Sequence, residues 1–324
     1  MTILEEESGR APQRAGLPQL GGRGLFVTDG GLETELVFHD GRDLPGFAAF
    51  PLLETSEGRL RLRRYYDGYL DIARGGGAGF VVETPTWRAN PDWAAQLGYS
   101  RPQLDQLNRA AVRLAEEVRA DAVADGITTV ISGQVGPRGD GYDPGTAMTA
   151  EQAQSYHARQ IGVFASASVD QVTAITMTNT AEAIGVVRAA TEAGVPAAVA
   201  FTVETDGRLP TGQPLHAAIE QVDRETGAAA AYFMVNCAHP THFRSALGGD
   251  GAWRHRIAGL RVNASTKSHA ELDASTELDD GDPDQLAADQ AALRDRLPAV
   301  AVLGGCCGTD ARHVAAIVSA WAAS

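Results

Sequence analysis

Eight short apolar runs, rich in β-branched residues, recur along this chain, and long stretches with helical spacing separate them. In the stretch 101–125, apolar side chains recur at three- and four-residue steps, as at Leu104, Leu107 and Ala111. Eight strands alternating with helices predict an α/β fold, a parallel sheet closed into a single (β/α)8 TIM-type barrel; an open doubly wound sheet is the alternative. The runs are residues 25–28, 80–82, 128–131, 171–175, 197–201, 232–235, 260–262 and 300–303.

The residues that follow these runs favour the barrel over the open sheet. Most runs end next to a polar or reactive side chain, and the C-terminal strand ends of a barrel form its active face. We therefore expect these side chains to meet at one mouth of the barrel. They are Asp29, Glu83, Gln134, Thr176, Glu204, Cys237, Asn263, Cys306 and Cys307.

The barrel is predicted to span residues 24–324, after a disordered lead-in over residues 1–23. Glutamates occupy positions 5–7, where a signal peptide would be basic, and no apolar run reaches the ~18 residues of a membrane span. The formal net charge of −14 argues against nucleic-acid binding and suits cationic small molecules. We therefore expect a cytoplasmic protein that binds small molecules, with neither nucleic acid nor membrane as a partner.

The three cysteines of the chain fall at two predicted strand ends. Cys237 follows the run 232–235, and Cys306 and Cys307 lie in a glycine turn, 304–308, after the last run. Two adjacent cysteines in a total of three argue against a disulfide framework. Three thiols that converge would hold Zn²⁺ and leave its fourth position open for a reactant. The alternative is a buried core thiol at Cys237 and two cysteines that only fill a turn.

A zinc site with three thiolates favours a particular chemistry. The metal lowers the pKa of a substrate thiol bound in its open position, which makes the thiolate available near neutral pH. Three anionic ligands also keep the site electron-rich, so the bound sulfur stays nucleophilic. Such a site favours attack on an activated methyl group over hydrolysis, for which neutral histidines or a carboxylate are the usual ligands.

Five motifs of this sequence resemble those of the homocysteine S-methyltransferase family. They are residues 28–36, 83–87, 132–140, 235–237 and 304–309, and the resemblance covers roughly residues 25–320. It implies a (β/α)8 barrel and a zinc ion bound by Cys237, Cys306 and Cys307. It also implies methyl transfer to homocysteine, giving methionine, with no catalytic residue beyond the zinc-activated substrate thiol.

The resemblance also implies where the substrates bind. Asp29, Gly30 and Gly31 would hold the amino-acid end of homocysteine, and a carboxylate for the ammonium with glycine amides for the carboxylate is physically consistent. Trp87 would approach the methyl donor, because an indole face attracts a sulfonium or quaternary ammonium; core packing is its alternative. Glu83 either faces the barrel mouth or caps a loop.

One position departs from the family pattern. Where the family commonly has a glutamate that helps hold the substrate ammonium, this sequence has Ile175. An ammonium buried there without a partner would be costly. Either Glu204, at the end of the fifth run, replaces that glutamate, or the acceptor is a different thiol. Asn236 is expected to hydrogen-bond near the site or to be structural.

These observations predict a zinc-dependent S-methyltransferase. Its partners would be a small thiol, with homocysteine preferred, and a cationic methyl donor: S-methylmethionine or S-adenosylmethionine ahead of betaine. The same chemistry on another thiol or thioether is one alternative. A module that takes methyl groups from a separate cobalamin (corrinoid) protein, and a catalytically inactive zinc- or thiol-binding protein, are two others.

Overall fold

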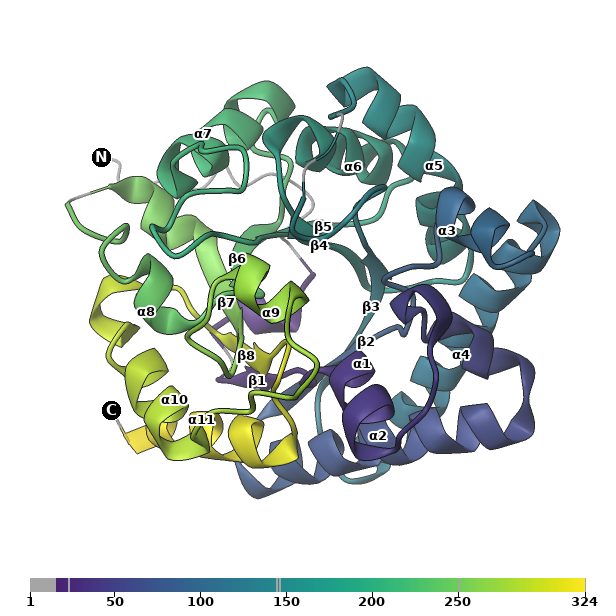
Figure 1. Cartoon of the computed structure of the whole chain (residues 1–324), viewed down its shortest axis with the longest axis horizontal. Helices are drawn as coiled ribbons and strands as arrows, with labels where there is room; N and C mark the ends of the chain where they lie inside the picture. The colour runs from purple at the N-terminus through teal and green to yellow at the C-terminus, as the bar shows by residue number, and fades with distance from the viewer. Residues whose placement is uncertain (1–15, 23, 144, 146, 250, 324) are drawn as a thin grey trace, which may run out of the picture.

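Eight parallel strands form a closed barrel in sequence order, as the sequence predicts (Figure 1). The computed structural model describes residues 16–22, 24–143, 145, 147–249 and 251–323. Phe26 pairs with Gly79 of the second strand and with Val302 of the last, which closes the sheet. The strands are β1 (Phe26–Val27), β2 (Gly79–Glu83), β3 (Thr129–Val135), β4 (Gln171–Met177), β5 (Ala197–Phe201), β6 (Tyr232–Asn236), β7 (Ile257–Val262) and β8 (Val302–Gly305).

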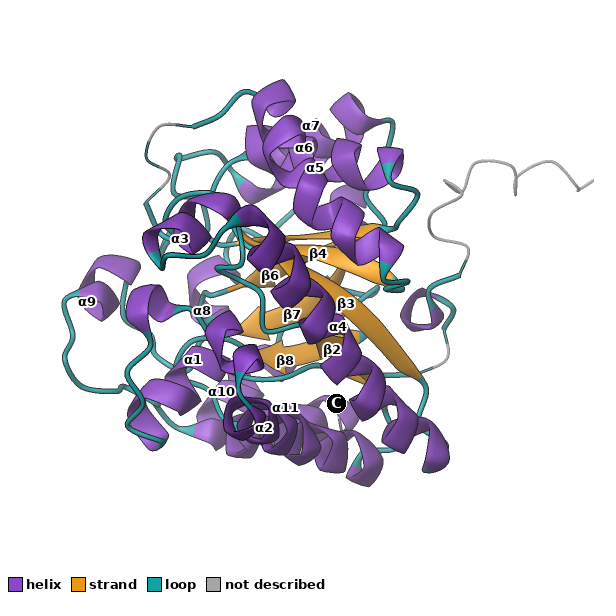
Figure 2. Cartoon of the chain, turned by 90° about the vertical axis from the view of Figure 1, so that its right-hand side faces the viewer, coloured by secondary structure: helices purple, strands orange, loops and turns teal. Residues whose placement is uncertain are grey.

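Helices surround the barrel on its outside, so that every strand is covered on its outer face (Figures 1 and 2). The predicted helix over 101–125 is observed as α4, which a capping box at Ser100 and Gln103 begins. The α-helices are α1 (Leu32–Thr34), α2 (Ser56–Gly75), α3 (Pro91–Gln96), α4 (Arg101–Ala124), α5 (Ala150–Ser166), α6 (Thr180–Glu192), α7 (Leu215–Thr226), α8 (Pro240–Phe243), α9 (His269–Asp273), α10 (Pro283–Ala291) and α11 (Ala311–Ala323). None of those in the described part of the chain combines the length and apolar character needed to cross a membrane.

The apolar core is divided by the sheet into two clusters. The larger cluster lies between the strands and the helices, while a smaller one, which includes Phe26, Val81, Val130 and Met234, fills the barrel interior. Inward and outward side chains alternate along a strand, so each strand contributes to both clusters. The interior is therefore packed with side chains.

The N-terminal segment enters this interior, which corrects part of the expected lead-in. Residues 1–15 lie outside the described residues, but Pro18–Leu20 form a 3-10 turn. Leu17 packs in the interior cluster, and the Gln19 side chain donates a hydrogen bond of 2.9 Å to Gln171 of β4. The residues just before the barrel thus close its N-terminal end. The buried side-chain amide of Gln19 is accommodated there because Gln171 accepts its hydrogen bond.

Two further expectations differ from the structure in detail. The segment 264–285, whose richness in Asp, Glu, Ser and Thr predicts a surface loop or irregular excursion, contains the short helix α9 and the first residues of α10. Ser268 and Glu271 form a capping box that begins α9. The last strand begins at Val302, two residues later than the apolar run suggests.

Candidate active site

A cavity of about 1050 Å³, counting the space at its open mouth, lies at the C-terminal ends of the strands. Residues on or directly after seven of the eight strands line it, including Asp29 after β1, Thr84 after β2 and Gln134 on β3. All three cysteines reach it, Cys237 from β6 and the adjacent pair from β8. The mouth predicted from the sequence is therefore where the reactive side chains gather.

The three cysteine sulfurs lie within 4.8 Å of one another, and the sulfurs of Cys237 and Cys307 are 3.3 Å apart. Sulfurs bound at about 2.3 Å in a tetrahedron are about 3.8 Å apart, so three thiols at these separations fit one metal ion. The thiol of Cys306 has a pKa well below its ordinary value, because the other two thiols hydrogen-bond to it. The donor set and its geometry suit a metal ion and make this cluster a candidate metal site.

Cys237 is held in an unusual backbone conformation. Its φ is +54°, in the left-handed region, and Thr176 at the end of β4 has a φ of +60°. Asn236 connects the two strand ends: its Oδ1 accepts from the Thr176 amide at 3.0 Å, and its Nδ2 donates to the Thr176 hydroxyl at 2.9 Å. Left-handed non-glycine residues cost of order 1–3 kcal/mol each, so the surrounding contacts must hold them in place. Asn236 also lies 3.8 Å from the sulfur of Cys306.

Tyr142, from the loop between β3 and α5, closes the thiol cluster on another side. Its hydroxyl lies 3.1 Å from the sulfur of Cys237 and 3.2 Å from that of Cys307. Burial, and then the neighbouring thiols, raise the pKa of Tyr142 well above its ordinary value. The phenol therefore stays protonated and can donate a hydrogen bond to a cysteine thiolate.

His269 on α9 supports both Tyr142 and Cys237. Its ring stacks on that of Tyr142 with centroids 4.1 Å apart, and its Nε2 lies 2.8 Å from the carbonyl oxygen of Cys237. Its Nδ1 lies 3.2 Å from a carboxylate oxygen of Glu204. The excursion after β7 thus contributes a residue that fixes the thiol cluster from outside.

Asp29 is already paired with a cation. Its Oδ1 accepts from Nη2 of Arg261 at 2.6 Å, and Tyr65 and Thr28 donate their hydroxyls to the same carboxylate at 3.0 and 2.9 Å. The side chains of Asp29 and Arg261 are only 6% and 3% exposed. Burial lowers and Asp29 raises the pKa of Arg261, with a net upward shift. This pairing argues against Asp29 as the partner of a substrate ammonium.

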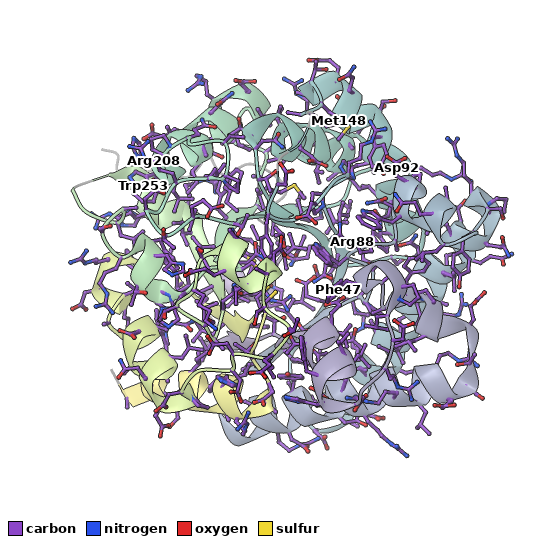
Figure 3. The ribbon with its side chains drawn as sticks, in the orientation of Figure 1. Phe47, Arg88, Asp92, Met148, Arg208 and Trp253 are labelled. Atoms are coloured by element: carbon purple, nitrogen blue, oxygen red, sulfur yellow. The ribbon has the colours of Figure 1, made fainter. Side chains whose placement is uncertain are left out.

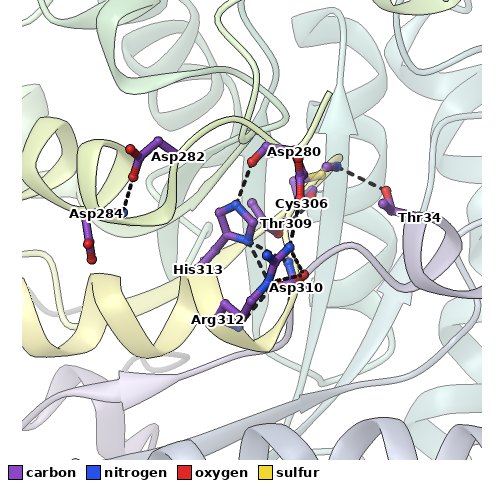
Figure 4. A network of polar contacts seen from close by, with 10 residues as sticks. Thr34, Asp280, Asp282, Asp284, Cys306, Thr309, Asp310, Arg312 and His313 are labelled. Carbon is purple, nitrogen blue, oxygen red and sulfur yellow. Dashed lines mark hydrogen bonds and ion pairs between the residues drawn. The ribbon is translucent and has the colours of Figure 1, made fainter. Parts of the chain in front are cut away.

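The glycines after Asp29 bring the turn before α1 against the cysteine turn. A Cβ on Gly31 would lie 2.6 Å from the carbonyl oxygen of Cys306, so no side chain fits there. The Gly31 amide donates to the carbonyl of Thr309 at 3.0 Å, so it is not free for a substrate carboxylate. Thr34 accepts from the Gly308 amide at 3.1 Å, and the Thr309 hydroxyl donates to the Cys306 carbonyl (Figure 4). Within the described residues, the Gly30 amide has no hydrogen-bond partner.

The comparisons with known proteins agree with this geometry. A sequence profile described as "Homocysteine S-methyltransferase" matches residues 26–321. The chain belongs to the homocysteine S-methyltransferase family. Homocysteine S-methyltransferase 4 of Zea mays is 26% identical over 321 residues, which cover 92% of this chain and 89% of the maize protein.

Solved structures of the homocysteine methyltransferase MmuM from Escherichia coli share the fold. The metallated form aligns with a TM-score of 0.72 at 22% identity, covering 97% of this chain and all of that one. The oxidized form aligns with a TM-score of 0.69 at 21% identity, covering 91% and 95% of the two chains. The chain is thus a methyltransferase of this family on a (β/α)8 barrel.

Trp87, the expected neighbour of the methyl donor, lines the cavity, but Arg88 also uses its ring. The Arg88 guanidinium lies 4.1 Å from the centroid of Trp87 and 3.9 Å from that of Trp93 (Figure 3). It also donates to the Gly139 carbonyl at 2.8 Å. The Arg88 guanidinium therefore already covers one face of the Trp87 indole. The methyl donor that is predicted to contact Trp87 has only the rest of the ring available.

Two carboxylates expected near the substrate lie elsewhere. Glu83 is buried inside the barrel, where Thr173 donates to it at 3.0 Å, and it is not among the residues that line the cavity. Burial raises the pKa of Glu83 to about 7. Glu204 faces His269 and does not line the cavity either. It therefore does not replace the glutamate missing at Ile175, which itself lines the cavity.

Four residues of the site were not predicted from the sequence: Glu33, Tyr142, Arg261 and His269. In the sequence, Arg261 is only a polar residue inside a predicted strand, and Tyr142 lies in a loop. Glu33 directly follows the glycines of the first motif and lines the cavity. An acidic residue at that place was a signal that could have been followed.

Proposed function

We propose that this chain is a zinc-dependent thiol S-methyltransferase that moves a methyl group from a cationic donor to homocysteine and releases methionine. The observation that carries the proposal is the convergence of Cys237, Cys306 and Cys307 on one cavity at the C-terminal ends of the strands. The family membership supports the reaction class. The thiol cluster supports the way in which the acceptor is activated.

Zinc suits this cluster because the donor set is three sulfurs and no nitrogen or carboxylate ligand. A bound zinc would lower the pKa of an acceptor thiol in its open position. Asn236 and His269 hold Cys237 in its strained conformation, so the ligand set is formed before the substrate arrives. The Tyr142 hydroxyl lies against the same sulfurs and has to yield space to the acceptor.

The reaction needs little from the protein beyond placement. The acceptor thiol loses its proton, and its sulfur attacks the methyl carbon in line with the departing group. The new sulfur–carbon bond forms as the donor's bond to that methyl breaks, and the donor leaves as a neutral molecule. Holding the two reactants in this alignment supplies most of the expected rate gain.

A cationic donor fits the walls of the cavity. Phe38, Phe47 (labelled in Figure 3) and Trp87 line it, and the two phenylalanines are exposed. Aromatic faces attract sulfonium and quaternary ammonium groups. The preferred donors are S-methylmethionine and S-adenosylmethionine, with betaine less favoured.

The test is a donor panel with zinc-loaded, reduced protein and homocysteine, in which methionine is measured. We expect methionine from one of the two sulfonium donors and none from the Cys307→Ser variant. Methionine that forms only when a methylated corrinoid protein is added would favour the cobalamin-dependent alternative. No methionine under any condition, with zinc bound, would refute homocysteine as the acceptor.

A further inference from the structure

An amino-acid thiol brings an α-ammonium into the cavity along with its sulfur. A charged group that leaves water for a partly buried site needs an oppositely charged partner. The end of β4 provides none, because Ile175 and Thr176 line the cavity there. Some other carboxylate has to face the ammonium if the acceptor is homocysteine, so the inference below rests on the proposed function.

Four carboxylates line the cavity, and three of them are unsuitable. Asp29 is neutralised by Arg261 at 2.6 Å. Asp140 lies 3.4 Å from Arg88 and accepts from the Tyr142 amide at 2.8 Å. Asp273, on α9, is exposed to solvent.

Glu33 is the fourth, and no cation is paired with it. Within the described residues its carboxylate has no ion pair and no hydrogen bond to another side chain; its own backbone amide bonds to it, and the residue is only partly exposed. It stands between Gly31, whose Cα lies against the Cys306 carbonyl, and Thr34, which accepts from the Gly308 amide. α1 is therefore packed directly on the turn that carries two of the three thiols.

The electrostatic surroundings of Glu33 agree with an unfilled cation site. Burial raises the pKa of Glu33 to about 7, with help from the nearby charges of Cys306 and Asp29, while a hydrogen bond from its own backbone amide and the charge of Arg261 lower it. A carboxylate in these surroundings gains more from an arriving cation than one that is already paired. Glu33 and Cys306 line the same cavity, so one small ligand in that cavity can contact both.

We propose that the Glu33 carboxylate binds the α-ammonium of the acceptor while the acceptor sulfur meets the three cysteines. Glu33 thus supplies from the β1–α2 segment the negative charge that β4 lacks at Ile175. It is a specificity-determining residue that selects amino-acid thiols over thiols without an amino group.

The test is a binding titration of zinc-loaded, reduced protein by calorimetry, without a methyl donor. The two probes are homocysteine and 4-sulfanylbutanoate, which is homocysteine without its amino group. The substitution is Glu33→Gln, which keeps the shape of the side chain and removes its charge. We expect homocysteine affinity to fall about 10- to 100-fold, the range for a hydrogen bond to a charged group, and 4-sulfanylbutanoate affinity to change less than about two-fold.

Glu35→Gln is the matched control, because Glu35 lies two residues away and is bonded to Arg61 outside the cavity. Zinc content and thermal unfolding of each variant establish that the metal site and the fold are intact. Equal losses for both probes, or no loss for homocysteine, would overturn the assignment of Glu33 while leaving methionine synthesis standing. A wild-type protein that binds 4-sulfanylbutanoate but not homocysteine would overturn both the assignment and the proposed acceptor.

Discussion

Removing Arg261 should destabilise this protein far more than removing an arginine from the surface. In Arg261→Met the chain keeps a side chain of similar length but loses the guanidinium that lies 2.6 Å from Asp29. The carboxylate then stays in the barrel interior with only the hydroxyls of Tyr65 and Thr28 as donors. The carbonyls of Gly305 and Gly30 also lose their bonds of 3.1 and 3.3 Å to the guanidinium.

The size of the effect follows from this geometry. Breaking a buried ion pair by removing one partner costs about 3–5 kcal/mol, because the remaining charge is uncompensated. An exposed pair contributes about 0.2–1 kcal/mol. Arg138 and Asp92, 2.7 Å apart and 49% and 43% exposed, form such a pair. Arg138→Met is therefore the control with the same chemistry and a different burial.

Urea unfolding of the zinc-loaded proteins at pH 7.5 measures both variants. We expect a loss of about 3–5 kcal/mol in the free energy of unfolding for Arg261→Met and about 1 kcal/mol or less for Arg138→Met. Asp29→Asn combined with Arg261→Met should recover part of the loss, because the double variant leaves no buried charge at this position. A loss below about 1 kcal/mol for Arg261→Met, or a double variant less stable than either single one, would refute the argument.

Four further predictions concern the thiols, Glu33 and Tyr142. Cys237→Ser should bind zinc well below one ion per chain, and chelation of the wild-type metal should abolish methionine formation; metal analysis and the methionine assay check both. The ratio of homocysteine to 4-sulfanylbutanoate affinity should fall as the pH drops through about 7, because protonation removes the charge of Glu33, and calorimetry from pH 6 to 8.5 should find this ratio flat in Glu33→Gln. The same raised pKa means that the folded protein binds a proton at pH 4.5–7 that the unfolded chain releases, so wild-type stability should fall relative to Glu33→Gln as the pH rises through this window. Tyr142→Phe should bind homocysteine about five-fold more tightly, since the acceptor then displaces no hydroxyl worth about 1 kcal/mol, and weaker binding would contradict that role.

The barrel and its thiol cluster could be predicted from the sequence because the sequence patterns that indicate them are local. The run 197–201 is observed as β5 with the same bounds, since a buried parallel strand is apolar on both faces. Cys237, Cys306 and Cys307 were expected to meet because strand ends of a parallel barrel share one mouth. Local patterns and one topological rule were sufficient for both.

The residues that contact Asp29 and the cysteines could not be predicted, because they are distant from them along the chain. Arg261 and Asp29 are 232 positions apart, and nothing in an apolar run tells which strand residues point into the barrel. Tyr142 reaches Cys237 across 95 positions from an irregular loop, whose path no periodicity predicts. Glu83 was predicted at the mouth because the sequence does not tell which strand residues point into the barrel. Its side chain is buried in the barrel interior.

The charges around the cavity connect these findings. Asp29 and Arg261 cancel, and Asp140 faces Arg88. Within the described residues, the cavity carboxylates without an ion pair are therefore Glu33 and the exposed Asp273. With zinc bound, three thiolates and one dication would add a net charge of about −1. Such a cavity attracts cations. In the proposed reaction, the acceptor carries an ammonium that pairs with Glu33. The donor carries the positive charge that makes its methyl group transferable. After transfer the donor's charge is gone and the acceptor sulfur is a neutral thioether, so both products bind this cavity less strongly than the reactants did.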